Sequence, residues 1–370
     1  SSLFLFPFCL KNTFPVLGFQ SNFALFPVAK DAATLQYVAR ISHGAPLGST
    51  DLVVDLGGSF LWMDCNSGHV SSSYRLISSC SVNCSRAKFH DLGSTSCLLN
   101  TNCYVSPYNG VTGSTSMGEL VEDVIAVDSV DPSDVGQSTT VDHFLFACAL
   151  TFHLQGLASG AKGMMGLGKA SISLPSQLSS SLGHPQKFSV CLSSSTGVLL
   201  TGSGDTVFGT KIARRLAVHE HGKLEAKLSS VVPYTTMVSS VYAIFSKAYV
   251  EAATKMNMTR VETVAPFGLC FSSKGPLVPE IDLVLQSEMV KWRIQGRNSM
   301  VKVSEESMCL GFLDGGLEQS SPIVIGGLQM EDNLLEFDIG SSMLGFSSSL
   351  LLKETTCSSS LQDSTLKQFF

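Results

Sequence analysis

Asp51-Leu52-Val53-Val54-Asp55-Leu56-Gly57-Gly58, followed by Phe60-Leu61-Trp62, is the most informative segment of this 370-residue chain. It reads as a short apolar strand that runs into a glycine-rich bend and is followed by a second apolar run. A carboxylate at the end of such a strand becomes catalytic when a second carboxylate faces it, because the two share one proton and activate water. The first question is therefore whether Asp55 has a partner.

The rest of the chain is typical of β structure. Residues 35–41 alternate apolar and polar side chains, as a half-buried strand does. Gly163–Gly168 and Ile323–Gly327 are similar apolar strands that end in glycines, each late in its own half, which indicates an internal duplication. Helices are expected at 174–178, where a proline follows the first residue, and at 241–256. Two β-rich lobes would face each other across a cleft.

Composition limits the function classes. The chain is 44% hydrophobic and only 15% charged, with a net charge of −6, which suits short strands joined by turns. There is no basic block, so nucleic acid is not an expected partner. The apolar leader at residues 1–21 resembles a secretory signal and is too short and interrupted to span a membrane.

Eleven cysteines, one of them (Cys9) in the leader, point to an oxidising compartment. A zinc site at Cys80, Cys84, Cys97 and Cys103 is an alternative that leaves the remaining cysteines unexplained. His219 and His221 have no further ligand nearby in the sequence, so no metal and no cofactor are expected. Two Asn-x-Ser/Thr triplets, at Asn83 and Asn257, are glycosylation candidates and agree with secretion.

The chain resembles the pepsin-like aspartic proteases over nearly its whole length. Within that fold it is similar to the plant branch that contains extracellular dermal glycoproteins, basic 7S globulins and inhibitors of xyloglucan-specific endoglucanases and xylanases. The resemblance implies a mainly all-β, two-lobed double β-barrel with a few short helices. It rests on the segments at 35–37, 53–62, 163–168, 174–177, 264–268, 281–287, 298–301 and 323–346.

The resemblance implies that this chain is not a protease. Asp55 matches the first catalytic aspartate of the family, but Leu56 and Gly58 replace the hydroxyl residues that follow it. The run 226–235, which should hold the second aspartate, contains none. Asp338-Ile339-Gly340-Ser341 resembles the motif but follows the late strand that ends in glycines, and Asp205-Thr206-Val207 lacks the glycine. Neither is therefore taken as the second aspartate.

Two more departures concern the cleft and the second lobe. The family's flap tyrosine has no clear counterpart, since Val111 lies near its place and Tyr108 is close by. Between Cys191 and Pro233 the family carries several dozen more residues, and the charged segment Lys211–Lys227 stands there instead. The expected layout is a leader at 1–21, an N-terminal lobe at 22–195, and a C-terminal lobe at 196–370 shortened around 200–230. A truncated product without function is the alternative.

The resemblance also implies the disulfide pairs, which use all ten cysteines outside the leader. They are Cys65–Cys148, Cys80–Cys103, Cys84–Cys97, Cys191–Cys357 and Cys270–Cys309.

The function that follows is inhibition of a secreted glycoside hydrolase, either a xyloglucanase or a xylanase, in the apoplast or cell wall, as in plant defence. A cation placed between two catalytic carboxylates blocks such an enzyme. Candidate contacts by position are Lys274, Arg297 and Lys353, each of which is otherwise an ordinary surface charge. An active aspartic endopeptidase and an extracellular storage or cell-wall glycoprotein are the alternatives. A monomer is expected.

Overall fold

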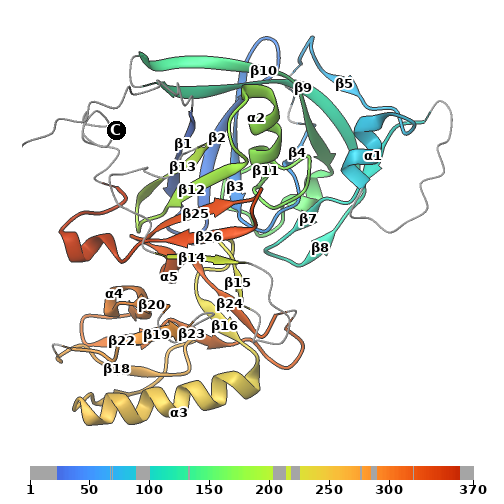
Figure 1. Cartoon of the computed structure of the whole chain (residues 1–370). Helices are drawn as coiled ribbons and strands as arrows, with labels where there is room; N and C mark the ends of the chain where they lie inside the picture. Colours follow the sequence, from blue (N-terminus) through green and yellow to red (C-terminus); the bar gives the residue numbers. More distant parts are fainter. Residues whose placement is uncertain are drawn as a thin grey trace, which may run out of the picture.

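The computed structural model describes residues 23–358, except 67, 69, 89–100, 132–133, 203–213, 218–225, 276, 285–289 and 320. The leader at 1–21, Cys97, Asp205, His219 and His221 therefore lie outside the described residues. The chain forms two β-rich lobes, with the larger one built mostly from the first half of the sequence (Figure 1).

The larger lobe is organised by a 14-stranded sheet. Its strand order is β14-β26-β25-β12-β13-β1-β2-β3-β11-β4-β10-β9-β5, and β6 also pairs with β9. Additional pairings of β9 with β1 and β2 curl the sheet upon itself. The strands are β1 (Phe23–Lys30), β2 (Tyr37–His43), β3 (Gly48–Asp55), β4 (Trp62–Asp64), β5 (Arg75–Leu76), β6 (Tyr104–Val105), β9 (Gly118–Asp131), β10 (Asp134–Ala149), β11 (Gly163–Gly166), β12 (Lys187–Cys191), β13 (Thr196–Thr201), β14 (Arg214–Ala217), β25 (Leu334–Asp338) and β26 (Met343–Phe346).

The smaller lobe contains separate, shorter sheets. One has the order β15-β24-β16-β23, another β17-β18-β22-β21, and β19 pairs with β20. A hairpin of β7 (Tyr108–Asn109) and β8 (Ser114–Thr115) belongs to the larger lobe. The smaller lobe's strands are β15 (Ala226–Leu228), β16 (Thr235–Met237), β17 (Arg260–Val261), β18 (Cys270–Ser272), β19 (Ile281–Val284), β20 (Lys291–Ile294), β21 (Met300–Lys302), β22 (Ser307–Leu310), β23 (Phe312–Asp314) and β24 (Ile323–Ile325).

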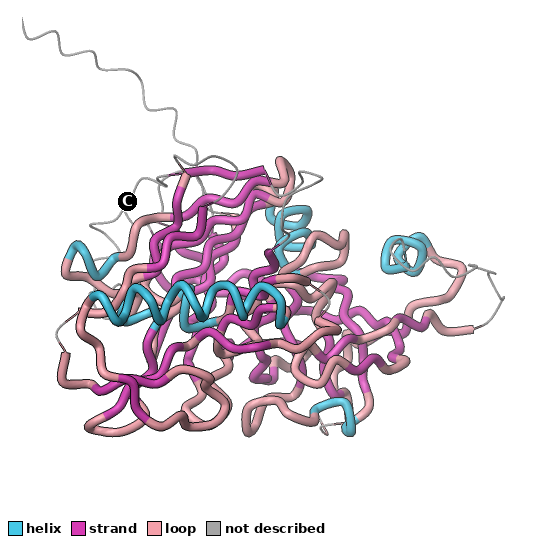
Figure 2. The backbone as a smooth tube through the Cα atoms, turned by 90° about the horizontal axis from the view of Figure 1, so that it is seen from below, coloured by secondary structure: helices cyan, strands magenta, loops and turns pink. Residues whose placement is uncertain are grey.

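The expected helices are present. α2 (Leu174–Leu182) begins with a proline in its first turn and ends at Gly183, which has a φ of 74°. α3 (Ser239–Lys255) is the long helix of the smaller lobe (Figure 2). Its Phe245 and Tyr249 rings contact Phe312 and Phe271. The other helical segments are α1 (Val82–Lys88), η1 (Thr151–Leu154), α4 (Gly296–Ser299), α5 (Gly327–Met330) and η3 (Leu350–Lys353). No described helix is long and apolar enough to cross a membrane.

The internal duplication is visible in the strand pairing. In the larger lobe β11 runs parallel to β3 and antiparallel to β4, and β4 runs parallel to β10. In the smaller lobe β24 runs parallel to β15 and antiparallel to β16, and β16 runs parallel to β23. The two-lobed, mainly β architecture expected from the sequence is thus confirmed.

Among the described residues, the repeat has one strand pairing fewer in the smaller lobe. In the larger lobe β3 pairs with both β2 and β11. Its equivalent β15 pairs only with β24 within the same described part of the chain. The shortening expected around 200–230 stays a prediction. The division of the chain at 195/196 stays a prediction, because β12, β13, β25 and β26, from both halves, share the large sheet.

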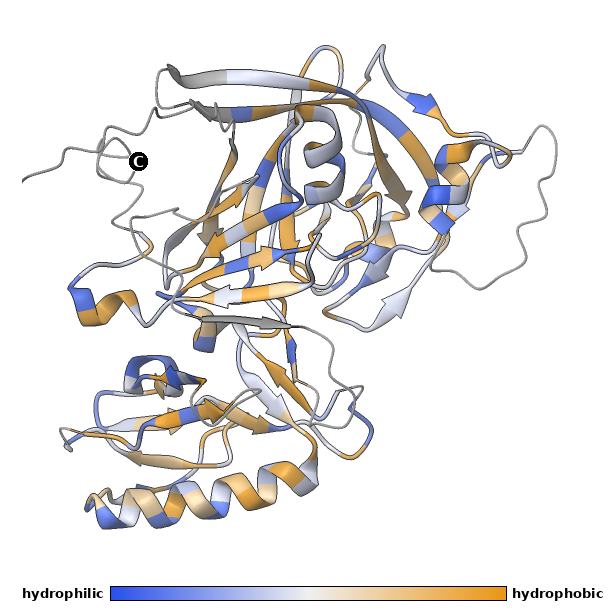
Figure 3. Ribbon diagram, in the orientation of Figure 1, coloured by the Kyte–Doolittle hydropathy of each residue, from blue (hydrophilic) through white to orange (hydrophobic). Residues whose placement is uncertain are grey.

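Hydrophobic residues occur along the strands and helices of both lobes (Figure 3), and the buried ones form the core. A continuous core runs from Phe26 and Ile41 in the larger lobe to Phe271 and Trp292 in the smaller one. A second cluster beneath the hairpin includes Trp62. The residues that face inward alternate along β2, as its sequence pattern predicts.

Disulfides brace both lobes. Three of them join cysteines that the resemblance pairs: Cys65–Cys148, Cys191–Cys357 and Cys270–Cys309.

The expected pairing in the first-lobe loop is wrong. Cys84 bonds to Cys103, not to Cys97, with a Cα–Cα distance of 5.7 Å. The reason is local: Cys84 is the buried residue of α1, and α1 packs on β6, directly after Cys103. Cys80 is also disulfide-bonded, so it cannot pair with Cys103 as expected.

Candidate functional site: a single carboxylate between the lobes

Asp55 ends β3 at the centre of the larger lobe and points toward the smaller one. Only 6% of the residue is exposed. Its Oδ1 accepts a hydrogen bond of 2.9 Å from the Gly57 amide. Burial raises the pKa of the Asp55 carboxyl, and the Gly57 amide, the Lys227 ammonium and the Gly58 amide partly oppose the rise.

Close packing around the bend leaves no room for a side chain at Gly58. A Cβ on Gly58 would lie 2.9 Å from Asp55 Oδ2 and 2.9 Å from the Gly166 Cα. A side chain at this position would displace the carboxyl or the neighbouring strand. Gly58 therefore allows the bend to lie directly against the Asp55 carboxyl and β11.

The position opposite Asp55 is taken by a serine. In the larger lobe, Met165 of β11 pairs with Val54 of β3, the residue before Asp55. In the smaller lobe, Ile325 of β24 pairs with Leu228 of β15, the residue before Ser229. The Ser229 amide continues this ladder with a hydrogen bond of 2.9 Å to the Ile325 carbonyl. Ser229 thus occupies in the smaller lobe the place that Asp55 occupies in the larger one. Its hydroxyl accepts from the Val231 and Val232 amides at 3.3 and 3.4 Å.

The next residue, Ser230, joins the two lobes. Its hydroxyl donates a 2.6 Å hydrogen bond to the Val54 carbonyl and accepts one of 3.2 Å from the Leu56 amide. These backbone groups flank Asp55, so Ser230 fixes the strand end that presents the carboxylate. Sequence reasoning missed Ser230. Aligning residues 226–230 with residues 52–56 would have placed Ser230 at the position of Leu56.

A cation lies beside the carboxylate. Lys227 Nζ and Asp55 Oδ1 are each 3.6 Å from the point where a Cβ on Gly57 would lie. Lys227 itself is exposed and comes from β15, across the junction between the lobes. Among the described residues no carboxylate hydrogen-bonds to Asp55 or contributes to the change in its pKa.

The β7–β8 hairpin closes over the site. A Cβ on Gly110 would lie 3.4 Å from Asp55 Oδ2 and 3.7 Å from Val231 Cγ2. The residue above the carboxyl is therefore Gly110. Val111, which sequence counting placed near the flap tyrosine's position, packs beside Gly156 instead. The Tyr108 carbonyl accepts a 3.1 Å hydrogen bond from Trp62 Nε1, while 44% of Tyr108 is exposed.

The rejected aspartate Asp338 lies at the end of β25 in the large sheet. It forms an ion pair of 3.1 Å with Lys187 and accepts a hydrogen bond from the Ser341 amide. These are contacts between neighbouring strands and a turn, away from Asp55. Within the described part of the chain, no group of three His, Cys, Asp or Glu side chains could hold a metal ion.

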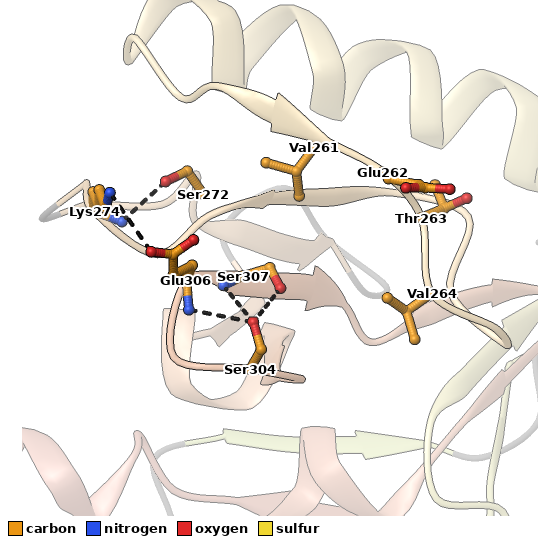
Figure 4. Close-up of a pocket in the computed structure, with 9 residues that line it drawn as sticks. All are labelled: Val261, Glu262, Thr263, Val264, Ser272, Lys274, Ser304, Glu306 and Ser307. Atoms are coloured by element: carbon orange, nitrogen blue, oxygen red, sulfur yellow. Dashed lines mark hydrogen bonds and ion pairs between the residues drawn. The ribbon is translucent and has the colours of Figure 1, made fainter.

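The candidate contact cations fall into two places. Lys274 follows β18 and lines an open pocket of about 570 Å³, where its ammonium lies 4.0 Å from Glu306 (Figure 4). Arg297, in α4, is exposed and lowers the pKa of the buried Asp332 carboxyl, although burial raises that pKa overall. Lys353 is exposed at the end of η3, whose first residue donates its amide to the Asp332 carbonyl. The helical segments of Arg297 and Lys353 thus both lie near Asp332, and Lys274 follows β18, in the sheet that also contains β21, the strand directly after α4.

Replacing Asp55 by asparagine tests the environment of the carboxyl. Asp55→Asn keeps an acceptor for the Gly57 amide and removes the ionisable group. Because the folded-state pKa is raised, the wild type is stabilised below the unfolded value of 3.8 and loses that stability as the pH rises. We expect calorimetry to show a higher Tm for Asp55→Asn at pH 7 and no gain at pH 3. Asp51→Asn on the same strand should show no gain at pH 7, and an equal shift at both pH values would contradict the account.

Ser230→Ala tests the junction between the lobes. The substitution removes the bond to the Val54 carbonyl and leaves the buried Leu56 amide without its partner, which should cost about 1–3 kcal/mol in urea unfolding. Ser246→Ala, on the exposed face of α3, is the control and should change stability by less than about 0.5 kcal/mol. Equal effects of the two substitutions would rule out a structural role for Ser230.

Comparison with known proteins assigns both halves. Residues 37–203 match the family described as xylanase inhibitor N-terminal, and residues 208–348 match xylanase inhibitor C-terminal. The chain is 40% identical to "Probable aspartic proteinase GIP2" of Nicotiana benthamiana, covering 92% of each chain, and 31% identical to "Basic 7S globulin 2" of Glycine max, covering 94% and 93%. The first alignment runs over 406 positions, more than this chain's 370 residues, so that relative has residues that this chain lacks.

Solved structures of other proteins share this fold. The crystal structure of edgp matches with a TM-score of 0.81 and 38% identity, covering 92% of this chain and 98% of that one. An aspartic proteinase from Irpex lacteus matches with a TM-score of 0.56 at 14% identity, covering 88% and 97%, which shows the fold alone.

Proposed function

Since the chain belongs to the xylanase-inhibitor-like family of the pepsin fold, we propose that it is a non-catalytic, secreted protein that inhibits a glycoside hydrolase. The observation that carries the non-catalytic part is that no carboxylate of the described residues hydrogen-bonds to Asp55. Peptide hydrolysis by this fold needs two carboxylates that share one proton. Here Ser229 stands at the second position and the Lys227 ammonium lies nearby.

The closed hairpin supports the same reading. A Cβ on Gly110 would already contact Asp55 Oδ2 and Val231, so the hairpin lies close over the carboxyl where a substrate peptide would bind. Secretion is supported by the disulfides in both lobes, which form and persist in oxidising compartments.

The inhibitory contact would come from exposed cations on the smaller lobe and its border. Retaining and inverting glycosidases both present two carboxylates that flank the scissile bond. An arginine can bind a carboxylate through two parallel hydrogen bonds, which a lysine cannot. Arg297 is therefore the stronger contact, and Lys353 is the second one, on a segment that also reaches Asp332. Lys274 is weaker, because Glu306 already neutralises it in part.

A storage role is the second candidate. It is favoured by the similarity to basic 7S globulins, and it requires no enzyme partner. An endopeptidase, which the name of the tobacco relative suggests, would need a carboxylate that the described residues do not bring to Asp55.

An inhibition assay separates these candidates. We expect the purified protein at micromolar excess to slow a xyloglucanase or a xylanase, and Arg297→Ala to weaken inhibition at least about tenfold, equivalent to about 1.4 kcal/mol. Lys302→Ala is the matched control, since Lys302 is another exposed smaller-lobe cation, held by Glu305 at 2.8 Å. Unchanged hydrolase rates would favour the storage role. Pepstatin-sensitive cleavage of a denatured protein at acid pH would overturn the non-catalytic proposal.

Glycosylation offers a separate test of secretion. Asn257 is exposed just beyond the end of α3, with a φ of 57°, whereas Asn83 is half-buried within α1 beside the disulfide-bonded Cys84. We expect mass spectrometry of protein from plant tissue to find a glycan at Asn257 in most molecules and less at Asn83. Thr259→Ala should abolish the Asn257 glycan alone. An unmodified Asn257 in secreted protein would contradict the prediction.

A further inference from the structure

The β7–β8 hairpin is held over the cleft by one buried side chain. Asn109 is fully buried, and its Nδ2 donates to the His153 carbonyl at 2.8 Å and the Gln155 carbonyl at 3.0 Å. Its Oδ1 accepts from the Val111 and Thr112 amides, which shapes the hairpin turn. The position of Gly110 over Asp55 therefore depends on η1, the short helix that contains His153.

His153 is itself a buried group. The residue is 1% exposed, and its ring lies against Trp62 with 4.7 Å between ring centroids. Neither ring nitrogen makes a well-formed hydrogen bond among the described residues, although the Pro107 carbonyl lies near the ring. Trp62 in turn donates to the Tyr108 carbonyl, so the ring that covers His153 also anchors the hairpin.

The surroundings of the imidazole offer no counter-charge. From β4 it meets Trp62, while the nearby Asp64 is engaged by the Thr151 hydroxyl at 2.9 Å. From η1 it meets the Phe152 ring, and from the segment before the hairpin it meets the Pro107 carbonyl. Burial lowers the pKa of His153, and the attraction of the Pro107 carbonyl opposes only part of that shift. A proton on this ring would thus be a buried cation that forms no ion pair with a carboxylate of the described residues.

We propose that η1 and the β7–β8 hairpin form an acid-sensitive latch over the cleft. A proton taken from solvent by His153 drives the ring out of its place against Trp62, η1 shifts, and Asn109 loses its two carbonyl acceptors. The hairpin then leaves Asp55 and Val231, and the cleft opens. The sign follows from linkage: a neutral imidazole favours the closed form above its ordinary pKa of about 6.5, and this preference is lost as the pH falls toward the lowered pKa.

Hydrogen exchange followed by NMR tests the latch. Protection factors, corrected for intrinsic exchange, are measured between pH 7.5 and 4.5 for the backbone amides of residues 107–117 and the Asn109 side-chain amide. We expect protection of these groups to fall at least about threefold as the pH decreases, while the amides of β2 and β3 keep theirs.

Two variants assign the effect. His153→Gln, which is neutral at every pH, should hold the hairpin's protection constant. His184→Gln replaces another buried histidine whose ring nitrogens are unpaired, and it should leave the wild-type response intact. Should His153→Gln fail to fold, the imidazole titration of His153 in the wild type must coincide with hairpin opening. A pH-independent hairpin, an unchanged response in His153→Gln, or a titration at another pH would overturn the proposal.

Discussion

The Ser230 hydroxyl holds together the point where the two lobes meet. It donates to the Val54 carbonyl and accepts from the Leu56 amide, so the smaller lobe fixes the backbone on both sides of Asp55. These bonds are buried, where an unpaired donor or acceptor costs the most. This contact fixes the strand end that presents Asp55, while the shared large sheet, the continuous core and the Cys191–Cys357 disulfide also join the lobes. The fold thus keeps the junction of a pepsin-like protein after one carboxylate has been replaced.

A serine, Ser229, at the position equivalent to Asp55 changes the electrostatics of the cleft. Two carboxylates in contact must share a proton, because both cannot ionise so close together. A single buried carboxyl with an ammonium nearby has no such constraint, and its protonation depends on burial against the pull of Lys227. The packing of β3, β11 and their glycines does not require the second acid. The fold can therefore persist whether or not the chemistry does, as expected when function resides in a few side chains on a stable scaffold.

Much of the fold could be predicted from the sequence because its signals are local. The apolar strands ending in glycines, the proline at the start of α2 and the apolar stripe of α3 each reflect a period or a backbone preference within a few residues. The partners of these segments were harder to predict. The pairing of Cys84 with Cys103 depends on how α1 lies on β6, and the cross-lobe role of Ser230 depends on register between distant strands. Likewise, Gly110 lies over Asp55 because Asn109 is anchored to η1. Counting residues along the hairpin could not predict this contact with a distant segment.

The proposed lack of protease activity depends on Asp55 titrating alone. The most direct measurement is a ¹³C NMR titration of the aspartate carboxyl carbons, with Asp55→Asn used to assign the signal. A solitary buried carboxyl predicts one single-proton transition above the ordinary aspartate pKa, with no second carboxyl titrating in step. Two coupled transitions, with a second carboxyl signal that changes when Asp55 is removed, would show that another acid faces Asp55 and would contradict the account.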